Sequence, residues 1–203
     1  MSRTTKKDVV TAFRTEEILR AARTIFARKG FYETTVDDIA RAAGVSKGTV
    51  YLYYSSKNDI YWAALKDGIR ELHEKLETAM NSVETVQEKV RTFIAVKMEY
   101  YQGNREFFKI YFSEFGNTFS HPLQMQKEIK ELYRKQARLL RSVIDQGVRE
   151  KSVRALSSDA AAYAISDVTR CVITHRLLNW SRKDARQDSD FVFDLVWKGI
   201  VKS

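Results

Sequence analysis

The sequence predicts an all-α protein, and three observations favour this class. The 203 residues include only one proline and eight glycines, so few positions favour the turns that join β-strands. Apolar residues recur at three- and four-residue spacing through most of the chain, which is the period of a helix buried on one face. Charged residues make up 30% of the chain and are interleaved with the apolar ones. We therefore expect about nine helices.

The first long helix runs from Thr11 or Thr15 to Lys29, and Gly30 closes it. Two short helices follow, within residues 35–57. The first has a capping-box pattern at Thr35 and Asp38 and ends at Gly44, which supplies a tight turn. Its apolar face carries Val36, Ile39, Ala40 and Ala43.

The second short helix presents an unusual outer face. Ser46 can cap it, and the spacing turns Val50 and Tyr54 inward. The residues left outside are Lys47, Gly48, Thr49, Tyr51 and Tyr53. Two helices joined by a glycine turn indicate a helix-turn-helix, and this face has the size and chemistry to enter a DNA major groove.

The stretch RTEEILRAARTIFARKGFYETT, followed by VDDIARAAGVSKGTVYLYYSSKNDI, resembles the N-terminal segment of the TetR (tetracycline-repressor) family of bacterial transcriptional regulators. The resemblance covers about the first 65 residues; beyond it only the length and the helical pattern agree. It implies a helix-turn-helix DNA-binding domain over residues 1–56 and an effector-binding and dimerisation domain over residues 57–203. It further implies a dimeric repressor that a small-molecule effector releases from its double-stranded DNA operator.

Each outer residue can be given a role on DNA. Lys47 and Thr49 would lie nearest the base edges, and Gly48 would let the backbone approach closely. Lys57 lies in the first turn of the next helix, where its positive charge opposes the helix dipole, so local stability does not explain it. A contact with a DNA phosphate would explain it, and the resemblance to the TetR family implies the same contact. The full set of predicted DNA contacts is Thr35, Ser46, Lys47, Gly48, Thr49, Tyr51, Tyr53 and Lys57.

The charge distribution favours the same partner. The net charge is +9, and up to Lys66 twelve basic residues stand against seven acidic ones. A basic solvated surface would give the same excess without DNA, so the motif carries the argument. The first ten residues are either a frayed terminus or a basic arm that adds contacts to DNA.

An aromatic segment, REFFKIYFSEFGNTF, begins at Arg105. It predicts either a packed aromatic core or a wall of an apolar effector pocket. Arg170 lies in an otherwise apolar helix and pairs with Asp167 or Glu114 or meets an anionic group of the ligand; we favour the ion pair. The candidate pocket residues are Tyr101, Phe108, Tyr111, Phe112, Phe115 and Arg170.

The last two predicted helices, 157–180 and 188–202, carry more apolar surface than one bundle edge needs. We expect them to form the interface of a homodimer, as the family resemblance implies. Burial within one chain is the alternative. A second hypothesis keeps the DNA-binding unit and gives the C-terminal bundle a protein partner in place of a small ligand, as in an adaptor.

The sequence lacks the residue patterns that would indicate a metal site, an enzyme active site, a cofactor site or a membrane segment. The three histidines are far apart, with no zinc-site spacing, and His175 reads as a hydrogen-bonded core residue. Cys171 is the only cysteine, which fits a reducing compartment. The sequence has no nucleophile elbow, Walker loop or dinucleotide fingerprint, so we expect no enzyme, metal or cofactor. No apolar run suits a membrane span or a signal peptide, and we expect a cytoplasmic protein.

Overall fold

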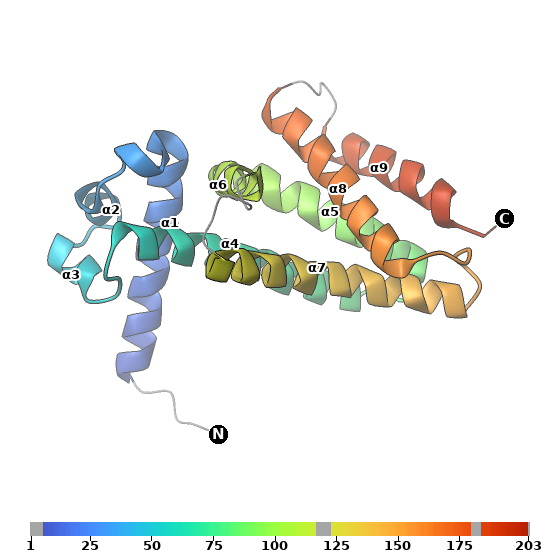
Figure 1. Ribbon diagram of the computed structural model, residues 1–203, viewed down its shortest axis with the longest axis horizontal. Helices are drawn as coiled ribbons and strands as arrows, with labels where there is room; N and C mark the ends of the chain where they lie inside the picture. The colour runs from blue at the N-terminus through green and yellow to red at the C-terminus, as the bar shows by residue number, and fades with distance from the viewer. Residues whose placement is uncertain (1–5, 117–122, 180–183, 203) are drawn as a thin grey trace. The chain divides into compact units, whose positions relative to one another are not determined.

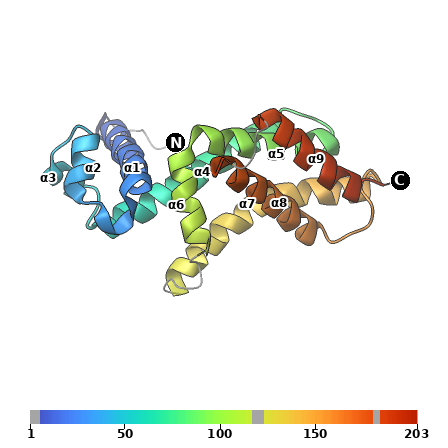
Figure 2. The same ribbon diagram turned by 90° about the horizontal axis from the view of Figure 1, so that it is seen from above.

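The computed structural model describes the backbone of residues 6–116, 123–179 and 184–202, and within these ranges the side chains of 6–9, 114–116, 123–126 and 129 are left out. The described ranges contain nine helices and no strand, so the all-α prediction is confirmed. The helices are drawn in Figures 1 and 2: α1 (Lys6–Glu33), α2 (Val36–Ala42), α3 (Lys47–Tyr51), α4 (Lys57–Asn81), α5 (Val86–Gly103), α6 (Arg105–Gly116), α7 (Leu123–Arg149), α8 (Ser158–Leu177) and α9 (Ala185–Ile200).

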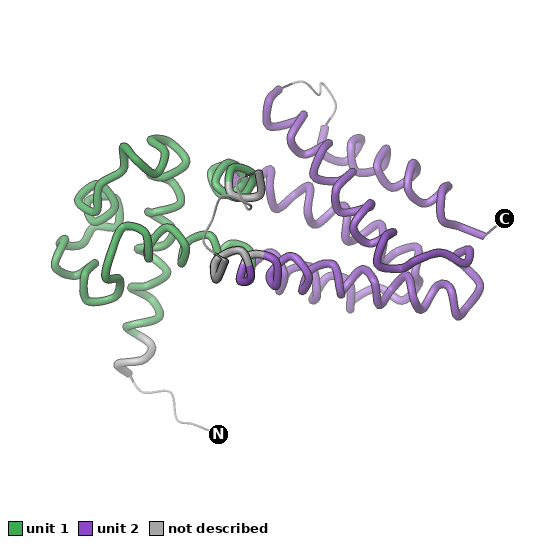
Figure 3. Tube along the Cα trace, in the orientation of Figure 1, with its two compact units in different colours: residues 1–69, 106–117 green, residues 70–105, 118–203 purple. Residues whose placement is uncertain are grey.

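The chain divides into two compact units, coloured separately in Figure 3. Unit 1 comprises residues 1–69 and 106–117, and unit 2 comprises residues 70–105 and 118–203. Helix α4 therefore contributes its first half to unit 1 and its second half to unit 2. The two units are described separately below.

In unit 1, α1 packs against α2, and α2 packs against α3. Helix α1 begins at Lys6, earlier than the predicted Thr11 or Thr15, because no breaker interrupts the segment before its buried stripe. Gly30 interrupts this helix with φ 80°, a left-handed conformation that side chains other than glycine rarely adopt. The buried residues from these helices and the start of α4 include Ile18, Ala22, Phe26, Ile39, Val50, Ile60 and Ala64.

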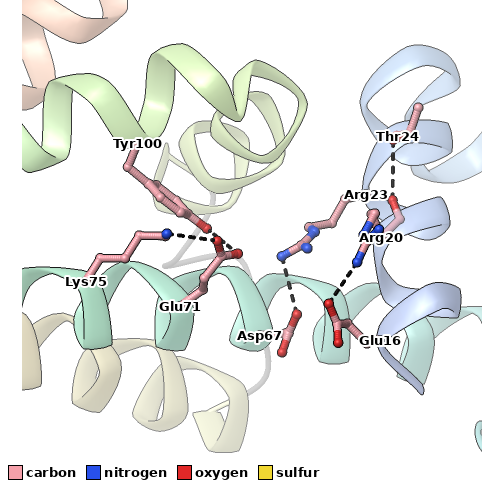
Figure 4. Close-up of polar contacts among 8 residues, drawn as sticks. All are labelled: Glu16, Arg20, Arg23, Thr24, Asp67, Glu71, Lys75 and Tyr100. Carbon is pink, nitrogen blue, oxygen red and sulfur yellow. Dashed lines mark hydrogen bonds and ion pairs between the residues drawn. The ribbon is translucent and has the colours of Figure 1, made fainter. Parts of the chain in front are cut away.

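The first half of α4 is joined to α1 and α6 within unit 1. The Arg23 guanidinium forms an ion pair with the Asp67 carboxylate at 3.3 Å, and both side chains are largely buried (Figure 4). At Gly68, a Cβ atom would lie 2.4 Å from Cε2 of Phe107, so the absence of a side chain lets the Phe107 ring lie against α4.

In unit 2, α5 is the central helix and packs against α7, α8 and α9. The core side chains come from all four helices and include Val90, Phe93, Ile94, Leu140, Ile144, Ile165, Ile173 and Phe193. The second half of α4 is tied to α5 by a hydrogen bond from the Tyr100 hydroxyl to the Glu71 carboxylate at 3.1 Å, which Figure 4 shows.

The helix starts follow the capping signals of the sequence. Thr35 with Asp38 and Thr85 with Glu88 form reciprocal capping boxes, and Ser157 caps α8. Each cap satisfies a backbone N–H that the helix itself leaves without a partner. In the described part of the chain, no helix combines the length and the apolarity needed to cross a membrane.

Candidate functional site

Helix α3 is short and is held by side-chain hydrogen bonds at its start. The Thr49 backbone N–H donates to Ser46 Oγ at 3.0 Å, and the hydroxyl oxygens of Ser46 and Thr49 lie 2.8 Å apart. Val50 is fully buried and anchors the helix to the unit 1 core. Ser46 and Thr49 therefore orient α3, in addition to any contact with DNA.

The outer face of α3 carries the predicted residues to different extents. Lys47, Gly48 and Tyr51 are exposed, whereas Thr49 and Tyr53 are half-buried. A Cβ atom at Gly48 would meet only Ser46 Oγ, at an ordinary 3.7 Å. Glycine inside a helix costs about 1 kcal/mol relative to alanine. Packing within the described part of the chain therefore does not require glycine at position 48.

Lys47 is held by a residue that the sequence analysis did not single out. Its ammonium lies 2.8 Å from the Asp37 carboxylate on α2, and this hydrogen bond raises the pKa of Lys47 above its ordinary value. Both side chains are about half exposed, so the pair is weak in water. A base contact by Lys47 has to replace or share this ion pair.

Thr35 lies at the start of α2, and its exposed hydroxyl belongs to the capping box. It accepts from the Asp38 backbone N–H at 3.1 Å and donates to the Asp38 carboxylate at 2.9 Å. The Lys29 ammonium, 2.8 Å from the other carboxylate oxygen, and the Thr35 donors hold the pKa of Asp38 well below its usual range. The cap is therefore ionised at any physiological pH.

Lys57 has a structural role that the sequence analysis did not foresee. Its ammonium donates to the carbonyl oxygens of Phe31 at 2.7 Å, Thr34 at 2.8 Å and Tyr32 at 3.1 Å. It also lies 4.5 Å from the centroid of the Phe31 ring. A lysine has three N–H donors, and these bonds use all of them. Lys57 thus closes the C-terminal end of α1.

The predicted pocket residues are divided between the two units. Phe108 and Tyr111 are buried on α6 in unit 1, and Phe112 on the same helix is partly exposed and stacks on Phe108. Tyr101 is buried on α5 in unit 2, and the Phe115 side chain lies outside the described residues. Their joint role in one pocket stays a prediction.

Arg170 forms one of the two ion pairs considered for it. Its guanidinium lies 2.9 Å from the Asp167 carboxylate, one helical turn away on α8 in unit 2. The side chain of Glu114, the other acidic candidate, falls among the side chains left out of the description. His175, expected in the core, is exposed on α8.

Lys97 is the residue that the sequence analysis missed. It is 4% exposed on α5, in the same stripe as Phe93, Ile94 and Tyr101. Burial, reinforced by the nearby Arg170, lowers the pKa of Lys97 from 10.5 to about 8. The spacing of the apolar residues around it was the available signal, since a lysine at that position of the stripe must lie inside.

Unit 2 also contains two hollows. The larger, about 720 Å³, lies between α4 and α5 and is lined by Glu71, Glu74, Lys75, Thr78, Ala79, Ser82, Val96, Glu99, Tyr100 and Asn104. The smaller, about 360 Å³, lies between α5, α8 and the first residue of α6, and is lined by Met98, Gln102, Arg105, Ile173, Arg176, Leu177 and Asn179. Among the described residues, no group of three or more His, Cys, Asp or Glu side chains is placed to hold a metal ion.

Two family models match the chain. Residues 18–64 match the bacterial regulatory proteins of the tetR family, and residues 83–196, more than half of the chain, match the tetracyclin repressor-like C-terminal domain. The chain belongs to the TetR family. It is accordingly a transcriptional regulator, and the first match contains all of α2 and α3.

Individual TetR-family proteins align over most of the chain. The fatty acid metabolism regulator protein of Bacillus subtilis is 24% identical over 185 residues, which are 91% of this chain and 94% of that protein. The structure of FadR from B. subtilis in complex with stearoyl-CoA has a TM-score of 0.80 and 24% identity, and covers 91% of this chain and 98% of that one. The structure of a protein from Saccharomonospora viridis in complex with choline has a TM-score of 0.83 and 17% identity. The match covers 95% of this chain and 100% of that one. At these identities the structural likeness shows the fold.

Proposed function

We propose that this TetR-family chain is a dimeric, ligand-responsive repressor whose α3 enters the major groove of an operator. The observation that carries the proposal is the outer face of α3, where exposed Lys47 and Tyr51 flank Gly48. Gly48 lowers helix stability without a packing reason, which favours close approach of DNA.

The DNA contacts divide into two kinds. Lys47 and Thr49 read base edges, and Lys47 leaves Asp37 to do so. Thr35, Ser46, Tyr51, Tyr53 and Lys57 contact phosphates and fix the register of α3 in the groove. Because Lys57 already closes the end of α1, its phosphate contact requires the ammonium to share its donors.

The dimer forms through α8 and α9 of two copies. Tyr163 and Cys171 on α8 and Leu195 on α9 are exposed, although each helix also has a buried face in unit 2. A two-fold axis at this surface would give two recognition helices. They would reach half-sites one helical turn of DNA apart, about 34–36 Å.

The effector is a small molecule that binds in the C-terminal region. The relatives solved with stearoyl-CoA and with choline support a ligand site in this fold. The two ligands differ in charge, since coenzyme A is anionic and choline is a cation. The buried aromatic residues of α5 in unit 2, Phe93, Tyr100 and Tyr101, favour an apolar body for the ligand. The effector releases DNA only to the extent that it binds the released conformation more tightly than the DNA-bound one.

The first test is selection of a binding duplex from random DNA, followed by titration at several salt concentrations. Lys47→Ala should weaken binding to the selected duplex. Lys109→Ala on α6 is the control: it also removes one exposed lysine from unit 1, and it should leave binding unchanged. Equal losses for both variants would argue against α3 as the reading element. Native mass spectrometry of the purified chain then tests the dimer and any bound small molecule; a monomer would contradict the two-half-site arrangement.

A further inference from the structure

Lys97 is a buried cation without a matching anion in the described part of the chain. Its side chain lies among apolar neighbours on α5, with the ammonium 5.1 Å from the centroid of the Phe93 ring. The described residues offer this ammonium no carboxylate or carbonyl oxygen at hydrogen-bonding distance. A charged group removed from water in this way destabilises the folded chain unless something compensates it.

The nearest charged groups, on α8, do not compensate Lys97. Arg170 carries a second positive charge, which acts against that of Lys97. Asp167 attracts both, but its carboxylate is bound to Arg170 and its side chain is 60% exposed. Among the described residues, the charged groups that act on Lys97 are therefore one cation, Arg170, and one carboxylate, Asp167, which lies at the surface.

More positive charge lies at the smaller hollow, one to two turns further along α5 and α8 and at the start of α6. Arg105 and Arg176 line this hollow, and no acidic residue does. Arg176 is paired with Asp188 at 2.7 Å and bonded to Gln102 at 3.1 Å, and Arg105 donates to the Leu177 carbonyl oxygen at 3.3 Å. Among the described residues, the region where α5 and α8 meet, from Lys97 to Arg105 at the start of α6, is consequently rich in cations.

We propose that this region binds the anionic head group of an amphipathic effector, a carboxylate or a phosphate, and that Lys97 is the buried cation that recognises it. The inference rests on the proposed ligand-responsive function and adds the sign of the ligand's charge. A lysine acts as a compact point charge toward such oxygens. Ligand binding supplies the counter-charge that the described residues do not offer to Lys97, so the residue that weakens the free protein strengthens the complex.

The test compares ligands with one tail and opposite heads. Isothermal titration calorimetry measures binding of decanoate, decanoyl-CoA and decyltrimethylammonium to the full chain. We expect the wild type to bind at least one of the two anions about tenfold or more tightly than the cation, since a hydrogen bond to a charged group contributes about 1.5–3 kcal/mol. A preference for decanoate over decanoyl-CoA assigns a carboxylate, and the reverse assigns a phosphate.

Variants connect the charge preference to Lys97. Lys97→Met, which keeps the length of the side chain, should lose about tenfold or more of the anion affinity and leave the cation affinity unchanged. Lys89→Met is the control, because it removes a lysine from a half-exposed position of the same helix. It should bind all three ligands as the wild type does. Lys97→Gln is the second variant, and it should lose the anion affinity as well. Circular dichroism and thermal melts check that each variant is folded.

Two results would overturn the proposal in different ways. If the wild type binds the cation as tightly as the anions, or Lys97→Met and Lys97→Gln keep the anion affinity, the head-group assignment fails and the sensor function stands. If the wild type binds none of the three probes, the proposed effector function fails together with the assignment.

Discussion

The ammonium of Lys57 donates to the carbonyl oxygen of Phe31 across 2.7 Å, and so joins the first residue of α4 to the C-terminal end of α1. The carbonyl groups near Gly30 have no continuing helix to bond them. Lys57 supplies the missing donors. The lysine is thus part of the frame that holds the helix-turn-helix, whether or not it also contacts DNA.

We predict that Lys57→Met lowers the free energy of unfolding by about 2 kcal/mol, because three carbonyl oxygens lose a charged donor. Urea unfolding measures this change. Salt titration of DNA binding in the same variant tests the phosphate contact, whose loss should lower the salt slope by about one. A destabilised variant with an unchanged slope would leave Lys57 only its structural role.

Gly68→Ala should destabilise the chain by about 1–3 kcal/mol, since the new Cβ would lie 2.4 Å from the Phe107 ring. Adding Phe107→Leu should give a double variant that loses less than the sum of the two single losses. Gly199→Ala on α9 is the control, because a Cβ there meets nothing within 4 Å and alanine favours the helix. Additive losses at residues 68 and 107 would contradict the contact.

The burial of Lys97 predicts a pH dependence of stability. Its pKa is about 8 in the folded chain and 10.5 as an ordinary lysine, so between these values the unfolded chain binds more protons. The free energy of unfolding therefore rises with pH across this window, by about 3 kcal/mol. Below pH 8 the full penalty is present. Lys97→Met should lack this rise. Urea unfolding of both proteins from pH 7.5 to 10.5 measures the difference, and an equal pH dependence of their free energies of unfolding would contradict the prediction.

Thr49→Val tests base reading with little change of shape. If the Thr49 hydroxyl contacts a base, the variant should change its preference at one position of each half-site, by about 1–3 kcal/mol. Repeating the selection of binding duplexes with the variant measures this. A uniform loss over all sequences would instead indicate a backbone contact, or a weakened bond to Ser46 at the start of α3.

Leu195→Lys should convert the proposed dimer to a monomer, because it places a charge in the proposed interface between copies of α9. Sedimentation velocity measures the molecular mass. Leu52→Lys is the matched control, as Leu52 is the more exposed of the two leucines and lies at the end of α3 in unit 1. If both variants sediment as dimers, the proposal that α9 forms part of the interface is wrong.

Local signals in the sequence predicted much of the fold. The capping box at Thr35, the breaks at Gly30 and Gly44 and the buried stripes need only residues close together in the sequence, because a helix brings residues three or four apart together. The outer face of α3 follows from the same spacing. These features also carried the resemblance to the TetR family.

Other features depended on residues brought together from distant parts of the chain. Lys57 bonds a carbonyl 26 residues away, and Gly68 makes room for a ring 39 positions later. The spacing could place Lys97 on a buried face but not show that its neighbours lack an anion, and it placed His175 in a core that the residue does not reach. By itself the sequence determined the helices and their buried faces, since periodicity and capping are local. Only the tertiary structure decided which charges are paired, because a partner's distance depends on how the helices pack.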